Sequence, residues 1–445
     1  MTPNPTIMKA VEQLNYRVTL GDVATKAGLE LNLTERGLLA LASDAGGHLQ
    51  VAETGDIVYQ FPKNFRSILR NKYWKLRWQQ TWDKIWGVLF YGIRISFGIV
   101  LIASILLIAV AIAAILIAAA SSRDEGGGDR DGGGTFFFPF YWFSDLFWFF
   151  SPNYGYYDTY PRTRSSGNRK FKRGNSSKDS EMNFLEAVFS FIFGDGNPNA
   201  DKEERRWQEI GTVIRNHRGA VVAEQIAPYL DELGNEFARD YEEYMLPVLA
   251  RFNGRPEVSS EGELVYHFPE LQTTATEGQA KQPVPNYFQE RLWRFSRASS
   301  SQLMMAGGLG ALNVILALML GSLLGDGEIA AQLGGLVLFA ESIYGLLLAY
   351  GIGFLAIPLV RYFWIQWRNG SIGERNQERH SREIPLAQPN AQLQEKLAYA
   401  ERFAAQKVID TNDLAYTTET DLAEQEFDRA EKIDAEWQRR LESGS

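Results

Sequence analysis

The sequence contains no cysteine among its 445 residues. Disulfides, thiolate zinc sites, cysteine nucleophiles and iron–sulphur clusters held by the protein in their usual form are therefore excluded. The four histidines, His48, His217, His267 and His380, show no metal-binding spacing. There is also no Walker motif, dinucleotide fingerprint or nucleophile elbow. We expect no metal, no cofactor and no enzymatic activity.

An excess of positive charge is also missing, since the formal net charge is -9. This charge argues against nucleic-acid binding by the chain taken as a whole. The N-terminus "MTPNPTIMKA" lacks both the basic start and apolar run of a signal peptide and the Arg/Ser-rich composition of a transit peptide. We expect the N-terminus to stay in the compartment of synthesis, as in a bacterial-type protein.

Three long apolar runs are present, at residues 95–120, 303–324 and about 333–362. A bilayer core requires about 20 apolar residues in a helix, so each run predicts a transmembrane helix. The short link "GDGE" at 325–328 joins the second and third runs and favours a helical hairpin.

Basic residues flank the runs and indicate which side each flank prefers. They precede the first run at Lys63, Arg66, Arg70, Lys72, Lys75, Arg77 and Lys84, precede the second at Arg291, Arg294 and Arg297, and follow the third at Arg361, Arg368, Arg375, Arg379 and Arg382. All three flanks prefer the cytoplasmic side, which three crossings cannot satisfy. Either a soluble region is translocated, or a further segment returns the chain between residues 121 and 290.

An aromatic segment, "TFFFPFYWFSDLFWFF" at 135–150, is one candidate for that return. Sixteen helical residues span only about 24 Å, short of a hydrocarbon core of about 30 Å. Trp142 and Trp148 favour the headgroup level. We predict a re-entrant or interfacial segment, with a full crossing as the alternative.

Tryptophans recur every four residues before the first run, at Trp74, Trp78, Trp82 and Trp86, with basic residues between them. This spacing predicts one face of an interfacial helix; RNA binding is a weaker alternative. Trp364 and Trp367, at the end of the third run, are also expected at the membrane interface.

One acidic residue, Glu341, lies within the third run. A carboxyl group in a membrane is costly, so it needs a partner or a role. Asn313 in the second run and Arg94 at the start of the first are candidate partners. We interpret Glu341 as a paired or protonated structural residue, with a proton or ion path as the alternative.

Two soluble regions share one pattern. Residues 5–62 and 201–270 each predict three helices followed by two strands, the pattern of a winged helix, and "VTLGDVATKAGL" resembles the helix–turn–helix core of that superfamily. In the first region we expect Thr19 to cap the second helix and Thr34 to begin the third; in the second region we expect residues 235–252 to form the third helix. The strand segments "GDIVYQFP" and "GELVYHFP" align at a constant offset of 207, which pairs Tyr59 with Tyr266 and Phe61 with Phe268. We therefore predict an internal repeat.

The predicted third helices are poorly suited to bind DNA. Arg36 is the one basic residue in the first, beside Glu35, and acidic residues dominate the second. Because phosphate neutralisation supplies much of DNA affinity, we expect these domains to bind proteins instead.

The predicted fold is mainly α, an integral membrane protein with about three transmembrane helices, an aromatic re-entrant or interfacial segment, and two winged-helix-like α+β domains. Its parts are a winged-helix-like domain (1–65), a basic Trp-rich interfacial helix (66–88), a transmembrane helix (89–120), a linker with the aromatic segment (121–183), a second winged-helix-like domain (184–275), a linker (276–301), a transmembrane hairpin (302–366) and an acidic helical tail (367–445).

This order of parts, taken with the "VYQFP" and "VYHFP" strands, resembles a membrane-protein family shared by cyanobacteria and chloroplasts. Plant members are labelled as iron–sulphur cluster biosynthesis proteins, a label that the missing cysteines contradict for this chain. The resemblance implies a thylakoid protein that assists biogenesis of photosystem II, at the stage of its chlorophyll-binding inner antenna subunit. No site residue carries over from the family.

We therefore expect a non-enzymatic assembly factor or scaffold of a cyanobacterial-type thylakoid, with its N-terminal domain and C-terminal tail on the cytoplasmic side. The expected partners are membrane lipids and either photosystem II subunits or other assembly factors. A membrane-tethered winged-helix transcription regulator is the alternative, and a transporter component is less favoured.

Overall fold

The computed structural model describes residues 3–72, 74–121, 182–275, 281–325, 328–410, 414–421, 424–427, 430, 434 and 437–439. The aromatic segment 135–150, with Trp142 and Trp148, lies outside these residues. The chain forms two compact units. The soluble unit comprises Met1–Ile85, Asn197–Trp293 and Arg368–Ser445, and the membrane unit comprises Trp86–Gly196 and Arg294–Trp367.

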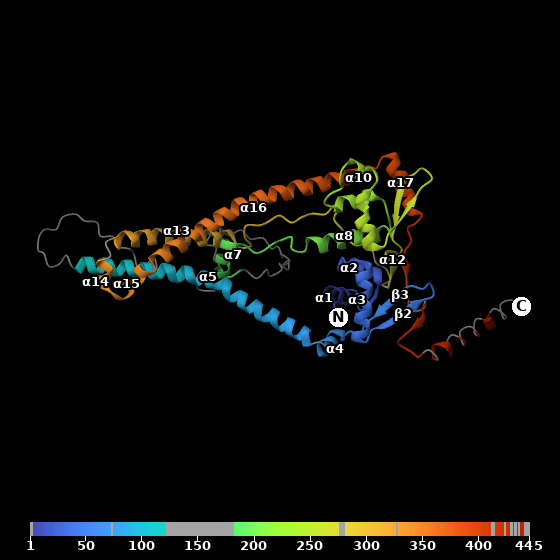
Figure 1. The fold of residues 1–445 in the computed structure, drawn as a ribbon, viewed down its shortest axis with the longest axis horizontal. Helices are drawn as coiled ribbons and strands as arrows, with labels where there is room; N and C mark the ends of the chain where they lie inside the picture. The colour runs from blue at the N-terminus through green and yellow to red at the C-terminus, as the bar shows by residue number, and fades with distance from the viewer. Residues whose placement is uncertain are drawn as a thin grey trace, which may run out of the picture. The chain divides into compact units, whose positions relative to one another are not determined.

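The first repeat of the soluble unit begins with three helices (Figure 1), and one short strand lies between the first two of them in chain order. Its elements are α1 (Pro5–Gln13), β1 (Arg17–Thr19), α2 (Leu20–Ala27), α3 (Leu31–Ala45), β2 (His48–Ala52) and β3 (Ile57–Gln60). Thr19 begins α2 as predicted, because its hydroxyl accepts from Asp22 N–H and the Asp22 carboxylate accepts from Thr19 N–H. Burial of Ile7, Val11 and Leu38 between these helices forms the core.

The third helix does not begin at Thr34, as the sequence indicated, but at Leu31. Thr34 is fully buried inside α3, and its hydroxyl donates back to the Glu30 carbonyl at 2.8 Å. A threonine that bonds the carbonyl four residues earlier is compatible with a helix interior. The capping signal was therefore misleading at this position.

The second repeat has the same order of helices and strands. It consists of α8 (Lys202–Asn216), β4 (Ala220–Val221), α9 (Ala223–Ile226), η1 (Ala227–Tyr229), α10 (Glu236–Asp240), η2 (Glu243–Met245), α11 (Leu246–Phe252), β5 (Arg255–Val258) and β6 (Leu264–His267), followed by α12 (Pro269–Gln272) and β7 (Thr273–Thr274). Strand order β4-β6-β5 matches β1-β3-β2 of the first repeat.

The two strand pairs also have the same register. Tyr59 lies opposite Leu49, and Tyr266 lies opposite Pro256, both at the 207-residue offset. All four repeat positions are buried, with Tyr59 at 2% exposure, Phe61 at 3%, Tyr266 at 3% and Phe268 at 0%. Both turns place glycine in the left-handed region, Gly55 at φ 85 and Gly262 at φ 89. The sequence repeat is therefore also a structural repeat, while membership of the winged-helix superfamily stays a prediction.

The third helix of the second repeat differs from the expectation. The sequence predicted one continuous helix over 235–252, but the chain is divided into α10, η2 and α11. Glu242 adopts a left-handed conformation with φ 53, and its carboxylate accepts from the Tyr266 hydroxyl and the Lys396 ammonium. These two bonds and Pro247 at the start of α11 explain the break.

The C-terminal tail is not wholly helical, in contrast to the prediction. After α17 (Ala391–Glu401) come β8 (Lys407–Val408) and β9 (Leu414–Thr417). β9 adds to β2 as the fourth strand of the first sheet, and β8 pairs with β7. Leu393 and Ala400 of α17 pack with Val222 and Val265 of the second repeat. The tail thus contacts both repeats of the soluble unit.

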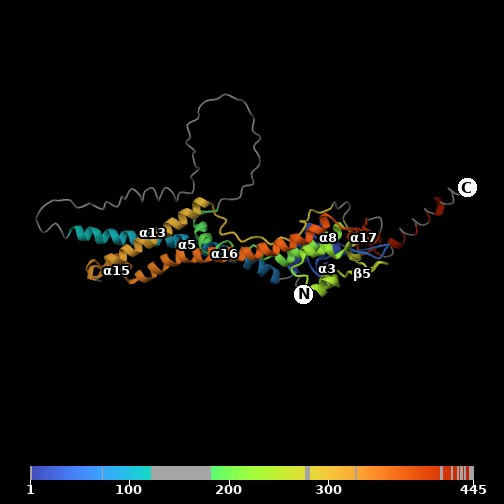
Figure 2. The same cartoon turned by 90° about the horizontal axis from the view of Figure 1, so that it is seen from above.

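The membrane unit contains three helices long and apolar enough to cross a membrane among the residues the structure describes: 84–120 of α5 (Trp74–Ser121), α13 (Ser300–Leu323) and α16 (Tyr344–Ala387). The predicted interfacial helix and first span are therefore one continuous helix after α4 (Phe65–Lys72). The unit also contains the shorter helices α7 (Phe184–Phe193), α14 (Glu328–Leu333) and α15 (Gly335–Ser342) (Figure 1). Figure 2 shows α5, α13 and α16 in a second view.

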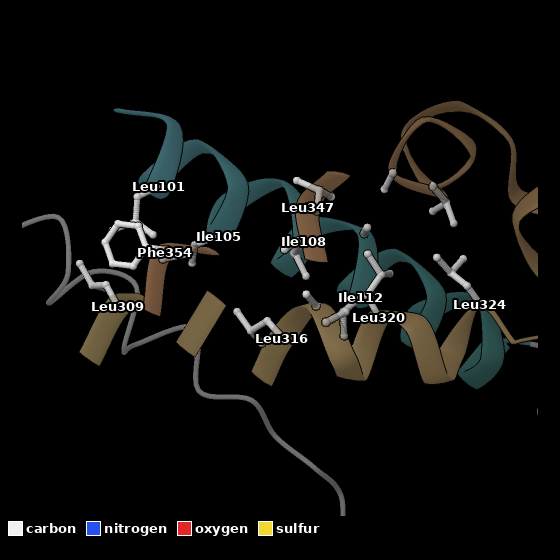
Figure 3. Packing of buried hydrophobic residues seen from close by; sticks show 14 of the residues in the cluster. Leu101, Ile105, Ile108, Ile112, Leu309, Leu316, Leu320, Leu324, Leu347 and Phe354 are labelled. Carbon is white, nitrogen blue, oxygen red and sulfur yellow. The ribbon is translucent and has the colours of Figure 1, made fainter. Parts of the chain in front are cut away.

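The membrane unit has a core between α5, α13 and α16. Figure 3 shows Ile105, Ile108 and Ile112 of α5 against Leu316 and Leu320 of α13. α7 packs into the same cluster through Val188 and Ile192, although the sequence placed residues from 184 onward in a soluble domain. Close packing of this kind stabilises helices against one another in a membrane.

The compact packing of the soluble unit predicts that its three segments lie on the same side of a membrane. Backbone pairing of β9 with β2 and α8 packing on α2 hold residues 1–62, 201–270 and 391–417 in one compact unit. We expect protease added to sealed vesicles to treat tags at the N-terminus, in the 259–262 turn and after Thr417 alike. Protection of one tag while another is cut would contradict this arrangement.

Candidate functional site

The predicted interfacial tryptophans are exposed. Trp74, Trp78 and Trp82 lie along α5, where adjacent ring centroids are 5.7 and 6.4 Å apart. Their exposed fractions, with Trp86, lie between 55% and 71%. Trp364 and Trp367 on α16 are exposed as well. Exposed indole rings are compatible with the headgroup region of a membrane. The interfacial role of these tryptophans stays a prediction.

Two of the predicted intramembrane polar residues, Asn313 and Arg94, have partners other than Glu341 in the structure. Asn313 is fully buried and donates to the Ser104 hydroxyl, between α13 and α5. Arg94 pairs with Asp195 at 3.4 Å. Glu341 lies on α15, because the third apolar run is divided at Ile343 and α16 begins at Tyr344. Each polar group thus has a separate position.

A buried carboxylate, Asp22, joins the two repeats. It is 1% exposed, and its oxygens accept from the Thr274 hydroxyl at 3.1 Å and from Ala275 N–H at 3.0 Å. The Arg215 guanidinium of α8 lies 2.7 Å from it. A buried charge is stable only when it is paired and hydrogen-bonded, so these contacts fix α2 on α8.

A second contact draws the tail into the same junction. The Arg17 guanidinium donates to the carbonyls of Ala275 at 2.7 Å and Ile409 at 2.9 Å. Gly21 of α2 contacts the Glu270 backbone so closely that a Cβ atom would overlap the carbonyl oxygen. Repeat one, repeat two and the tail therefore meet at α2.

A largely buried ion cluster forms a second junction, and we call it the helix clamp. It consists of the acids Asp231 and Glu290 with the bases Lys202, Arg206, Arg375 and Arg379. Arg375 binds Glu290 through two hydrogen bonds of 2.8 Å. Arg379, 1% exposed, contacts Glu290 at 2.8 Å and also Asp231. The clamp fastens the C-terminal half of α16 to the second repeat.

Two asparagines extend the clamp along α16. Asn376 accepts from Glu290 N–H and donates to the Glu290 carbonyl, both at 2.9 Å. Seven residues earlier, Asn369 makes the same pair of bonds to Trp293, at 2.8 and 2.9 Å. Residues 281–293, which the sequence described as part of a linker, thus form a strap packed on the helix, with Phe288 fully buried.

The electrostatics of the clamp depend on two opposing effects. Burial alone raises the pKa of Glu290, but hydrogen bonds from Arg375 and Arg379 and the charge of Lys202 outweigh it, so this pKa lies well below its usual value. Burial likewise raises the pKa of Asp231, and Arg206 and Arg379 overcome that effect. Both carboxyl groups therefore stay ionised at neutral pH.

One carboxyl group of the soluble unit shows the opposite shift. Burial raises the pKa of Glu209, on α8, to about 7, and the charges of Arg205 and Arg291 offset only part of the effect. Its Oε2 atom is buried without a hydrogen-bond partner within the described part of the chain. Glu209 therefore changes charge near neutral pH.

The third helix of the first repeat, α3, carries one basic residue, Arg36. On α3 the solvent side presents Leu33, 50% exposed, and Leu39, 43% exposed, on either side of Arg36. In the second repeat the corresponding helix, α11, has seven residues, and Leu246 at its start is 62% exposed. Among the described residues, no group of three His, Asp or Glu side chains could hold a metal ion.

Comparison with known proteins adds one relative. The chain is 36% identical over 446 residues to the Arabidopsis thaliana protein described as "Uncharacterized protein At5g03900, chloroplastic". The match covers 98% of this chain and 81% of the relative. The chain belongs to this plant protein's family. No family profile matches the chain, and no solved structure matches it.

Sequence reasoning on this family member missed the clamp. Arg375, Arg379 and Arg382 were interpreted as a flank that sets membrane orientation, but their spacing of four and three places them on one helix face. That spacing could have indicated a shared acidic partner. Asp231 and Glu290 carry no comparable signal, because their proximity depends on how the second repeat and the strap fold.

Loss of the Glu290 charge should destabilise the soluble unit. We expect Glu290→Gln to lower the free energy of unfolding by about 3–5 kcal/mol at pH 7, because buried Arg379 loses a counter-charge. The contribution of Glu290 is present at neutral pH and is lost as the pH falls below about 4.5, the ordinary value for Glu. Denaturation of the purified full chain at pH 7 and at points down to about pH 2 measures both effects.

Glu378→Gln is the matched control, since Glu378 pairs with Arg382 on the same helix but is 62% exposed. An exposed pair contributes less than about 1 kcal/mol. Equal losses in the two variants would contradict the role assigned to the clamp.

Ionisation of Glu209 should lower the free energy of unfolding of the chain as the pH rises. Its pKa is higher in the folded chain, at about 7, than its ordinary value of 4.5, so the folded state holds the extra proton between these values. We expect the stability of Glu209→Gln relative to wild type to increase from pH 4.5 to pH 7 and then level off. Thermal melts across this range measure it, with Glu204→Gln, exposed on the same helix, as control. A pH-independent difference would exclude this titration.

Proposed function

We propose that this protein is a non-enzymatic assembly factor or scaffold of a thylakoid-type membrane, and that it assists photosystem II biogenesis at the chlorophyll-binding inner antenna subunit. Its soluble unit, built from two winged-helix-like repeats, binds other proteins. The chloroplastic relative and three helices long and apolar enough to cross a membrane support the location. The photosystem partner comes from the family resemblance.

The observation that carries the protein-binding role is the outer face of α3. In a winged helix the third helix enters the major groove and presents bases that contact DNA. Here Leu33 and Leu39 flank the single Arg36. Exposed leucines on one helix face favour contact with an apolar protein surface.

The second repeat supports the same role. Its third helix is divided, and the remaining α11 is only seven residues long, too short to present a row of side chains along a groove. The surrounding Glu232, Glu236, Asp240 and Glu243 are exposed and would repel phosphate. The transcription-regulator alternative therefore has less support than protein binding.

The test removes the apolar face without disturbing the core. A Leu33→Glu/Leu39→Glu double variant should lose most co-purification of photosystem II antenna subunits from solubilised thylakoid membranes, because two charges replace the contact surface. Ile57→Glu, 40% exposed in the same repeat, is the matched control and should retain these partners.

Wild-type protein that recovers no photosystem II subunit or assembly factor would overturn the proposal. A gel shift of the full chain with DNA at moderate salt that is abolished by Arg36→Ala would favour the transcription regulator instead.

A further inference from the structure

A cavity of about 230 Å³ lies where four parts of the soluble unit meet. Thr25 comes from the first repeat, Arg215 and Arg218 from the end of α8 and the turn after it, Lys281 from the strap and Gln406 from the tail. Among the residues that the structure describes, no position lining this cavity carries a carboxylate. The cavity differs in this respect from the acidic exterior.

The charge of this cavity is unusual for the chain. Three cationic side chains line it, Arg215, Arg218 and Lys281, in a protein of net charge -9. Asp22 balances the charge of Arg215, so Arg218 and Lys281 give the lining its excess positive charge. An anion between these groups offsets that excess. The lining therefore favours a negatively charged occupant.

Hydrogen-bonding groups surround the charges. Thr25 is 6% exposed and lines the cavity, and its hydroxyl is buried without a hydrogen-bond partner among the described residues. A buried polar atom left without a partner is costly, so it requires a ligand or an ordered water. The amides of Asn216, Gln272 and Gln282 add further donors and acceptors.

The fixed position of Arg215 makes the site preorganised. Asp22 holds its guanidinium at 2.7 Å, and Asp22 is itself fixed by backbone and hydroxyl donors. An arginine that is already ordered loses little side-chain entropy when a ligand binds. Arg218 and Lys281 are exposed and can adjust toward the ligand.

We propose that this cavity binds a small oxyanion of the phosphate class, either inorganic phosphate or a small phosphate ester. Pockets for drug-sized ligands measure about 300–1,000 Å³, so a cavity of 230 Å³ suits a smaller ligand. Arginine, lysine and hydroxyl groups are common phosphate donors in proteins. The ligand would link both repeats, the strap and the tail.

The test measures binding to the purified full chain in detergent. Inorganic phosphate and glycerol 3-phosphate are titrated against potassium chloride of matched ionic strength, with the melting temperature and calorimetric heat as readouts. We expect a saturable rise in melting temperature with phosphate that chloride does not produce, since a ligand of the folded state alone stabilises it. Tighter binding of the ester than of phosphate identifies an organic phosphate as the occupant.

An Arg218→Ala/Lys281→Ala variant should bind at least about tenfold more weakly, equivalent to about 1.4 kcal/mol. Arg255→Ala removes an exposed charge from the same repeat outside the cavity and should bind as wild type. Thr25→Val keeps the shape of a buried residue and should weaken binding without unfolding the chain.

A non-saturable effect equal to that of chloride would overturn the inference, as would full binding by the Arg218→Ala/Lys281→Ala variant. The inference does not rest on the proposed function. Phosphate binding with no photosystem II partner would reject only the assembly role, and normal co-purification with no phosphate binding would reject only this site.

Discussion

The soluble unit depends on the burial of one carboxylate, Asp22. Its partners come from two distant parts of the chain, Thr274 and Ala275 from one and Arg215 from the other. Because an uncompensated buried charge is strongly unfavourable, these partners must all be in place when the unit is folded. This requirement positions α2 on α8, and with them the two repeats, β7 and the tail strand beside it. The outer face of α3 and the cationic cavity both take their places from this junction.

The helix clamp applies the same principle to a candidate membrane helix. α16 continues without a break from an apolar segment into residues that bind Asp231 and Glu290. Two asparagines of the same helix, Asn369 and Asn376, bond to the strap at Trp293 and Glu290. The C-terminal part of α16 is therefore fixed within the soluble unit.

The internal repeat shows which structural features local sequence patterns can predict. Alternation in "GDIVYQFP" and "GELVYHFP" predicted strands, turn and buried aromatic positions, because side-chain direction in a strand has a period of two. The capping box at Thr19 was equally local and was correct. Errors arose where distant residues decide. Glu242 interrupts a predicted helix to reach Tyr266 and Lys396, and Val408 lies in a strand because β7 offers a partner.

The break at Ile343, which divides the third apolar run between α15 and α16, was not evident from the sequence. The sequence by itself determined the internal repeat, the lack of cysteine chemistry and the presence of three long apolar helices. These features depend on composition and on neighbours within a few residues, so hydropathy and periodicity are sufficient. Only the tertiary structure decided that Arg94, Asn313 and Glu341 are separate, that residues 281–293 form a packed strap, and that Arg215, Arg218 and Lys281 line one cavity. The partners in each case are far apart in the chain. No local pattern specifies which buried charge a distant arginine will meet.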